Sequence, residues 1–138
     1  MTLNYPVQIS PAEEGGFLAQ LVDFTEGFTE GETRDEALFM AADVLSMLLE
    51  HRLEAEQEIP LPSPLEEGFN AVLPSATVQA AVLLRLAREE RSFSDMARAL
   101  NTSFSAVQRL ERPSNSISLR QLEKAAAVLG KKVVLSLE

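Results

Sequence analysis

The sequence FSDMARALNTSFSAVQRLER, residues 93–112, carries the pattern that decides how its half of the chain folds. Its small and apolar residues are spaced as in two short helices that cross at close range: Met96, Ala97, Leu100, Val107 and Leu110. Ala97 is small enough to let the second helix approach the first. Asn101 follows four residues later, where the turn needs a positive φ that asparagine tolerates better than most residues. This spacing predicts a helix-turn-helix.

The outward side of the second helix is polar, because Val107 and Leu110 turn inward. Its polar residues suit contacts with DNA: Ser103, Ser105, Gln108, Arg109 and Arg112. Glutamine and arginine bond the edges of adenine and guanine, and N–H groups at a helix N-terminus bind phosphate. Arg88 and Arg98 on neighbouring helices are expected to contact the DNA backbone. The alternative is that these arginines only solvate a small helical bundle.

Charge divides the chain near its middle, although the net charge of all 138 residues is −9. Residues 1–75 carry 15 acidic and 2 basic residues, a net charge of −13. Residues 76–138 carry 6 acidic and 10 basic residues, a net charge of +4. Such a change of sign is typical of two domains with different partners. We therefore predict two domains, residues 1–74 and 75–138, with the DNA-binding surface in the second.

The first domain has the pattern of a mixed α+β fold. Two β-prone runs flank the segment SPAEEGG and predict a hairpin. Thr33 and Glu36 form the capping box of a helix that should run to about residue 53, with apolar residues every three or four positions. Alternating prolines at residues 60–64 then favour extended chain, and FNAVL at residues 69–73 predicts one short strand.

Capping residues predict the other helices of the second domain, which should be all-helical up to its last residues. The expected N-caps are Ser75 or Thr77, Ser92, Ser103 and Ser118. Gly130 is placed for a left-handed C-terminal cap, and KKVVLSL at residues 131–137 predicts a C-terminal strand. Phe93 stands where many helix-turn-helix domains carry a phosphate-binding glutamine. We expect Phe93 to pack at the start of its helix instead.

Composition excludes several kinds of site. The chain has no cysteine, which rules out disulfides and thiolate metal ligands. Its single histidine, His51, leaves little from which to build a histidine metal site or a catalytic triad. No apolar run reaches membrane-spanning length, and no signal-like segment opens the chain. We therefore expect a cytoplasmic protein that is not an enzyme and needs no cofactor or metal.

The acidic segment DFTEGFTEGETRDE, residues 23–36, allows three interpretations. A two-metal nuclease needs three or four converging carboxylates, but no further carboxylate in an apolar setting follows to complete the site. A plainer interpretation is an acidic loop that leads into a helix, whose dipole favours Asp35 and Glu36. The third fits the charge better: an acidic domain is a docking face for a basic protein, especially one that binds nucleic acid.

Segments along nearly the whole chain resemble the HicB family of antitoxins. They are YPVQI at residues 5–9, GGFLAQLVDF at 15–24, GETRDEAL at 31–38, IPLPSP at 59–64, MARALN at 96–101 and VQRLERPSNSISLRQLEKAAAVLGKKVVLSL at 107–137. The family commonly has proline in place of Thr25 and aspartate in place of Glu32. The resemblance implies a bacterial protein with a partial RNase H-like domain of hairpin, helix and strand. An XRE/Cro-like helix-turn-helix domain is then expected to follow.

The resemblance also implies a function, that of an antitoxin which neutralises a small basic HicA-type toxin. That toxin is an mRNA interferase, and the antitoxin represses the shared operon by binding an inverted repeat as a homodimer. The expected toxin contacts surround the loop at residues 24–32: Asp23, Phe24, Glu26, Phe28 and Glu30. We expect the last helix and residues 131–138 to form the dimer contact. The alternative is a free-standing transcriptional regulator whose first domain senses a small molecule.

Overall fold

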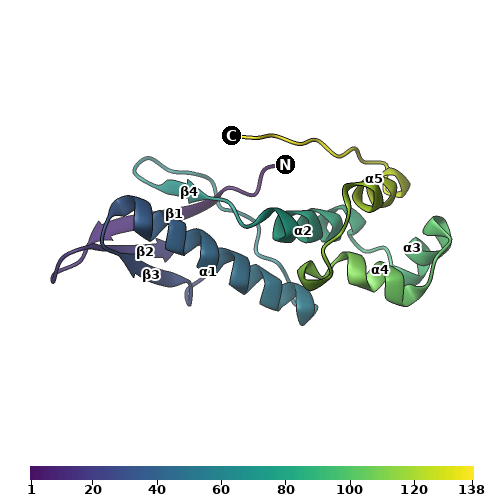
Figure 1. Ribbon diagram of the computed structural model, residues 1–138, viewed down its shortest axis with the longest axis horizontal. Helices are drawn as coiled ribbons and strands as arrows, with labels where there is room; N and C mark the ends of the chain where they lie inside the picture. Colours follow the sequence, from purple (N-terminus) through teal and green to yellow (C-terminus); the bar gives the residue numbers. More distant parts are fainter. The chain divides into compact units, whose positions relative to one another are not determined.

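The N-terminal hairpin lies at the centre of an antiparallel sheet in the computed structural model, which describes residues 1–138 (Figure 1). Strands β1 (Tyr5–Pro11) and β2 (Phe17–Leu21) pair antiparallel, with Val7 opposite Leu21. The turn between them ends in two glycines with positive φ, which any other residue adopts with difficulty. The predicted hairpin is confirmed.

Two further strands complete this sheet, in the order β3-β2-β1-β4. Strand β4 (Asn70–Val72) pairs antiparallel with β1 and confirms the strand predicted after the prolines. Strand β3 (Phe28–Gly31) pairs antiparallel with β2. The sequence does not predict β3, because its glutamate and glycine are poor strand formers. Main-chain pairing with β2 makes it a strand.

Helix α1 (Arg34–Glu54) packs against the sheet and supplies much of the core around it. The Thr33 hydroxyl caps it by accepting from the Glu36 N–H (3.1 Å). The Glu36 carboxylate accepts from the N–H of Glu32 (3.3 Å) instead of Thr33, so half of the predicted capping box forms. The inward face of α1 buries a residue every four positions: Ala37, Ala41, Leu45, Leu49 and Leu53.

The proline segment after α1 forms no helix or strand, and two side chains tie it to the sheet unit. The hydroxyl of Tyr5 donates to the carbonyl oxygen of Pro60 (2.7 Å), and its ring lies 5.8 Å from that of Phe24, centre to centre. The carboxylate of Asp23 accepts from the N–H of Ser63 (3.0 Å) and from its hydroxyl.

The second half of the chain is helical. Its elements are α2 (Ala76–Arg88), α3 (Phe93–Leu100), α4 (Phe104–Leu110), the short 3-10 helix η1 (Pro113–Asn115) and α5 (Leu119–Val128). The side chains of Ser92, Ser103 and Ser118 cap α3, α4 and α5, which confirms these predictions. The chain divides into two compact units, residues 1–79 and 80–138, whereas the sequence places the division near residue 75.

Asn101 joins α3 to α4 with a φ of 53°, the left-handed conformation that the sequence predicts. A core of Met96, Ala97 and Val107 lies around this turn. Phe93 and Leu100 pack against that core, partly buried. The spacing in residues 93–112 therefore predicts correctly the two helices, the left-handed residue between them and the core that they share.

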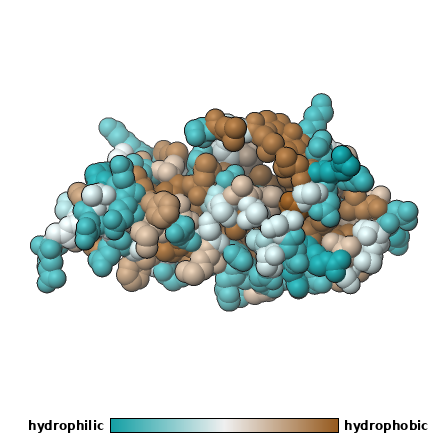
Figure 2. All heavy atoms as spheres, viewed as in Figure 1, coloured by the Kyte–Doolittle hydropathy of each residue, from teal (hydrophilic) through white to brown (hydrophobic).

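The C-terminal segment corrects one expectation. Gly130 has the predicted positive φ of 72°, but residues 131–138 after it form no strand. A strand needs a hydrogen-bonded neighbour, and this segment pairs with no strand of the chain. Three of its apolar side chains are exposed instead: Val134, Leu135 and Leu137. Figure 2 shows hydrophobic surface where Figure 1 draws the C-terminal segment in yellow.

Candidate functional site

The predicted DNA-contact residues of α4 differ in how far they are exposed to solvent. Ser105 and Arg109 are exposed, whereas Gln108 and Arg112 are half-buried. Ser103 is exposed, but its hydroxyl accepts a backbone N–H of the first turn of α4 (3.1 Å). Ser103 therefore fixes where α4 begins, and Ser105 and Arg109 are the predicted contacts most open to a ligand.

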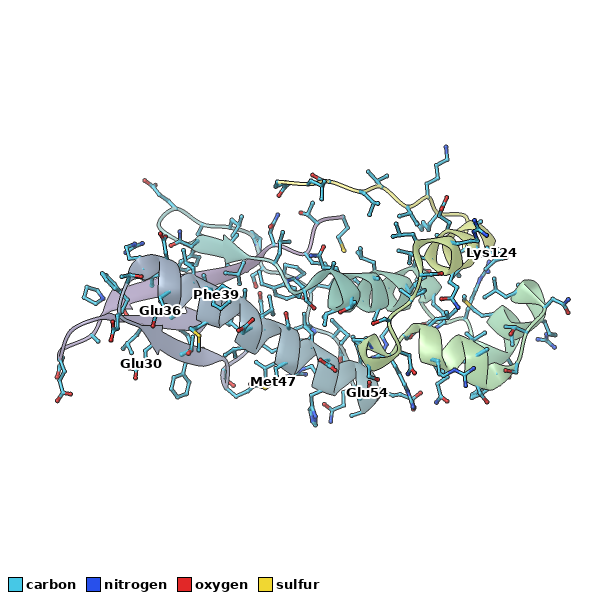
Figure 3. The ribbon with its side chains drawn as sticks, viewed as in Figure 1. Glu30, Glu36, Phe39, Met47, Glu54 and Lys124 are labelled. Atoms are coloured by element: carbon cyan, nitrogen blue, oxygen red, sulfur yellow. The ribbon has the colours of Figure 1, made fainter.

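A groove of about 330 Å³ adjoins Arg109. Residues of α4, η1 and α5 line it, among them Gln121 and Lys124 of α5, the latter labelled in Figure 3. Arg109 and Lys124 bring two cations to one groove, a setting that suits phosphate or the acceptor edge of guanine. The sequence pattern misses Lys124, because it comes from a helix outside residues 93–112.

Arg88, predicted to contact the DNA backbone, is held inside the helical unit by an ion pair. Its Nε and Nη2 donate to the carboxylate of Glu111 at 2.6 and 3.0 Å, and the Nε of Arg85 donates to it at 3.2 Å. The side chains of Arg88 and Glu111 are only 15% and 4% exposed. A carboxylate this buried needs its cations. Arg88 therefore positions the C-terminal end of α4 and has little surface to offer a phosphate.

Phe93 packs at the start of α3, as expected. The guanidinium of Arg88 lies 4.2 Å from the centre of its ring, and the ring of Phe104 meets it edge-on at 5.6 Å. Arg98 differs from Arg88, since it is exposed and pairs only with Asp95 on the surface. A surface pair of this kind contributes little stability, so Arg98 can exchange it for a phosphate.

The predicted toxin contacts in the acidic unit fall into a buried and an exposed group. Phe24 is 1% exposed and packs on Tyr5, so it is a core residue with almost no surface to offer a toxin. Asp23 is half-buried, and its carboxylate holds Ser63 of the proline segment. Burial, followed by the charge of Asp23, raises the pKa of Tyr5 to about 12.

Glu26, Phe28 and Glu30 form the exposed group. Phe28 and Glu30 lie on one face of β3, because alternate residues of a strand share a face. Glu26 pairs with Arg52 at 3.3 Å. A hydrogen bond from its own backbone, and to a lesser extent Arg52, lowers the pKa of the Glu26 carboxyl. These residues give the acidic unit two accessible carboxylates and one accessible aromatic ring.

The carboxylates of residues 23–36 do not converge as a two-metal nuclease requires, since no three His, Asp or Glu side chains lie together as a metal site. None of the helices combines the length and the apolar character needed to cross a membrane.

Comparison with known proteins identifies the class of the molecule as the antitoxins of bacterial toxin–antitoxin systems. Residues 4–82 match the family model described as the HicB-like antitoxin of such a system. The chain belongs to this HicB-like antitoxin family, whose members are regulatory and not catalytic.

Its relatives extend the likeness over both units. Antitoxin HicB of Escherichia coli K12 is 33% identical over 135 residues, which cover 96% of this chain and 98% of the relative. Antitoxin HicB 1 of Photorhabdus laumondii is 30% identical over 136 residues, which cover 99% of this chain and 88% of the relative.

Proposed function

We propose that this antitoxin neutralises a HicA-type mRNA interferase with its acidic unit and represses its own operon with its helical unit. The observation that carries the proposal is that the net charge changes sign where the chain divides into its two compact units. Residues 76–79 are uncharged, so the unit of residues 1–79 has a net charge of −13 and the unit of residues 80–138 has +4. An acidic surface attracts a basic RNA-binding toxin, and a basic surface attracts DNA.

In the acidic unit, we infer that Glu26, Phe28 and Glu30 contact the toxin. Their carboxylates compete with RNA phosphates for the basic surface of the toxin, while the phenylalanine ring adds apolar contact area. Asp23 stabilises the proline segment by holding Ser63. The sheet with its helix is consistent with a partial RNase H-like fold.

In the helical unit, α3 and α4 act as a helix-turn-helix with α4 in the major groove. Ser105, Gln108 and Arg109 read base edges, and Ser103, Arg98, Arg112 and Lys124 meet the backbone. The left-handed turn at Asn101 and the exposure of Arg109 support this assignment. Helix-turn-helix proteins bind two half-sites as dimers, so the operator is expected to be an inverted repeat.

The dimer forms through residues 131–138, together with α5. The main chain of the segment, which pairs with no strand, and the exposed Val134, Leu135 and Leu137 support this contact. An extended apolar segment of this kind gains hydrogen bonds and burial when it pairs with its copy across a two-fold axis.

Fluorescence anisotropy with labelled DNA from the region upstream of the gene tests the DNA-binding part. Arg109→Ala should cost about 1–3 kcal/mol of discrimination between that DNA and a scrambled duplex, because a bidentate base contact is lost. Arg98→Ala should weaken binding to both duplexes alike and reduce the salt dependence. The same loss in both variants would show that the division into base and backbone contacts is wrong.

A further inference from the structure

The outer face of α1 carries large apolar side chains that its unit does not bury. The inward face already fills the core, yet Phe39 and Met47 are 67% and 63% exposed, and Met40 is 37% exposed. Hydrophobic residues interrupt the hydrophilic surface on this side of the unit in Figure 2. Large apolar residues gathered on one exposed helix face indicate an interaction site.

Met40 and Met47 lie on one line of the helix together with four carboxylates. The line, which we call the α1 stripe, runs at intervals of four and three residues: Glu36, Met40, Asp43, Met47, Glu50 and Glu54. Such intervals place side chains along one side of a helix. At about 1.5 Å per residue the stripe is about 27 Å long. Figure 3 labels Glu36, Phe39, Met47 and Glu54 along α1.

The spacing of the stripe matches the packing of one helix along another. Alternating intervals of four and three residues form the contact seam of paired helices, in which side chains of one helix fit between those of its neighbour. A second helix laid along α1 therefore meets methionine and carboxylate in turn. The flexible methionines adapt to the shape of such a partner.

The charge of the stripe decides which partner fits. It holds four carboxylates and no lysine or arginine, and Asp43 and Glu50 form no ion pair within the chain. Arg34 and Arg52, the two cations of this unit, are engaged elsewhere, over the rings of Phe17 and Phe24. A second copy of the stripe would set carboxylates against carboxylates, and nucleic acid would be repelled in the same way.

We propose that the α1 stripe, with Phe39 beside it, is the docking site for a basic amphipathic helix of the partner toxin. Lysine or arginine residues of that helix pair with Asp43 and Glu50, and its apolar residues cover Met40, Met47 and Phe39. The inference rests on the proposed function, since it takes the partner to be a basic toxin. It adds a second contact region to the one at Glu26, Phe28 and Glu30.

Isothermal titration of the full chain with the basic protein encoded beside it tests the stripe. Asp43→Lys/Glu50→Lys should weaken binding roughly tenfold or more, because two attractive charges become repulsive. Glu13→Lys/Glu14→Lys makes the same change of net charge in the exposed hairpin turn and should leave the affinity within about twofold. Lysine is a good helix former, so α1 should persist, which circular dichroism checks.

A second measurement uses the absence of cysteine from the chain. The thiol introduced by Asp43→Cys should react with a maleimide at least about tenfold more slowly when the toxin is bound, whereas one introduced by Glu14→Cys should not slow. If the wild type does not bind the neighbouring protein, the proposed function fails. If it binds, but neither the Lys variant nor the thiol responds, the stripe is not the docking site and the proposed function stands.

Discussion

Tyr5 connects strand β1 to the extended segment after α1, and it is the one tyrosine in a chain without tryptophan. Burial, with a smaller contribution from the charge of Asp23, raises its pKa to about 12. In the unfolded chain a tyrosine ionises near pH 10. The neutral hydroxyl donates to Pro60, and ionisation removes this donor. The stabilisation is therefore complete below a pH of about 10 and is lost as the pH rises toward about 12.

An alkaline titration followed by the ultraviolet absorbance of tyrosinate should report this single residue. We expect a midpoint near pH 12 in the native protein and near pH 10 in urea. The free energy of unfolding should decrease as the pH rises from about 10 to about 12. Asp23→Asn should keep most of the elevation, because burial is the larger cause. A native midpoint near pH 10 would show that the Tyr5 hydroxyl is open to water.

At the scale of elements, Glu111 holds the end of α4 to α2 through Arg85 and Arg88. Glu111→Ala leaves two largely buried arginines without their carboxylate and should lower the free energy of unfolding by about 3 kcal/mol. Arg98→Ala breaks a surface pair of the same charge type and should change it by less than about 1 kcal/mol. Urea denaturation followed by circular dichroism measures both. Equal effects would mean that burial does not distinguish the two ion pairs.

Elements whose signal is local could be predicted from the sequence. Serine caps and apolar periodicity predict α3, α4 and α5. The presence of asparagine at position 101 is enough to predict the left-handed turn there. Features that depend on contacts between residues far apart in the sequence could not be predicted from it. Strand β3 exists only through pairing with β2, and Arg88 joins a carboxylate 23 residues away. Phe24 looks like part of an acidic loop until the fold brings Tyr5 to its ring.

In the candidate site, too, some features follow from local sequence patterns and others only from the folded structure. The outward face of α4 follows from helical periodicity, whereas Lys124 is absent from the prediction because it reaches the Arg109 groove from α5. The α1 stripe is visible in the sequence as intervals of four and three residues. What the sequence does not show is the exposure of Met47 and of the neighbouring Phe39, which leaves both open to a partner.

For the whole molecule, the proposed dimer contact in the C-terminal segment would link self-association to the proposed DNA binding. Deleting residues 131–138 should give monomers in size-exclusion chromatography with light scattering, because the apolar residues and the main chain of this segment are the proposed dimer contact. Operator binding should weaken with it, since one helical unit then meets one half-site. Lys131→Ala/Lys132→Ala removes the same cations but keeps the apolar residues, and should remain dimeric. A dimeric deletion variant would move the contact elsewhere.

The most direct test of the central claim, that the acidic unit neutralises a toxin independently of DNA binding, is growth of cells that express the neighbouring basic reading frame. That reading frame alone should arrest growth, and co-expression of this chain should restore it. Arg109→Ala should restore growth equally well, because the proposed toxin contacts lie in residues 1–79. The account is contradicted if the chain does not rescue growth, or if rescue is lost with Arg109→Ala.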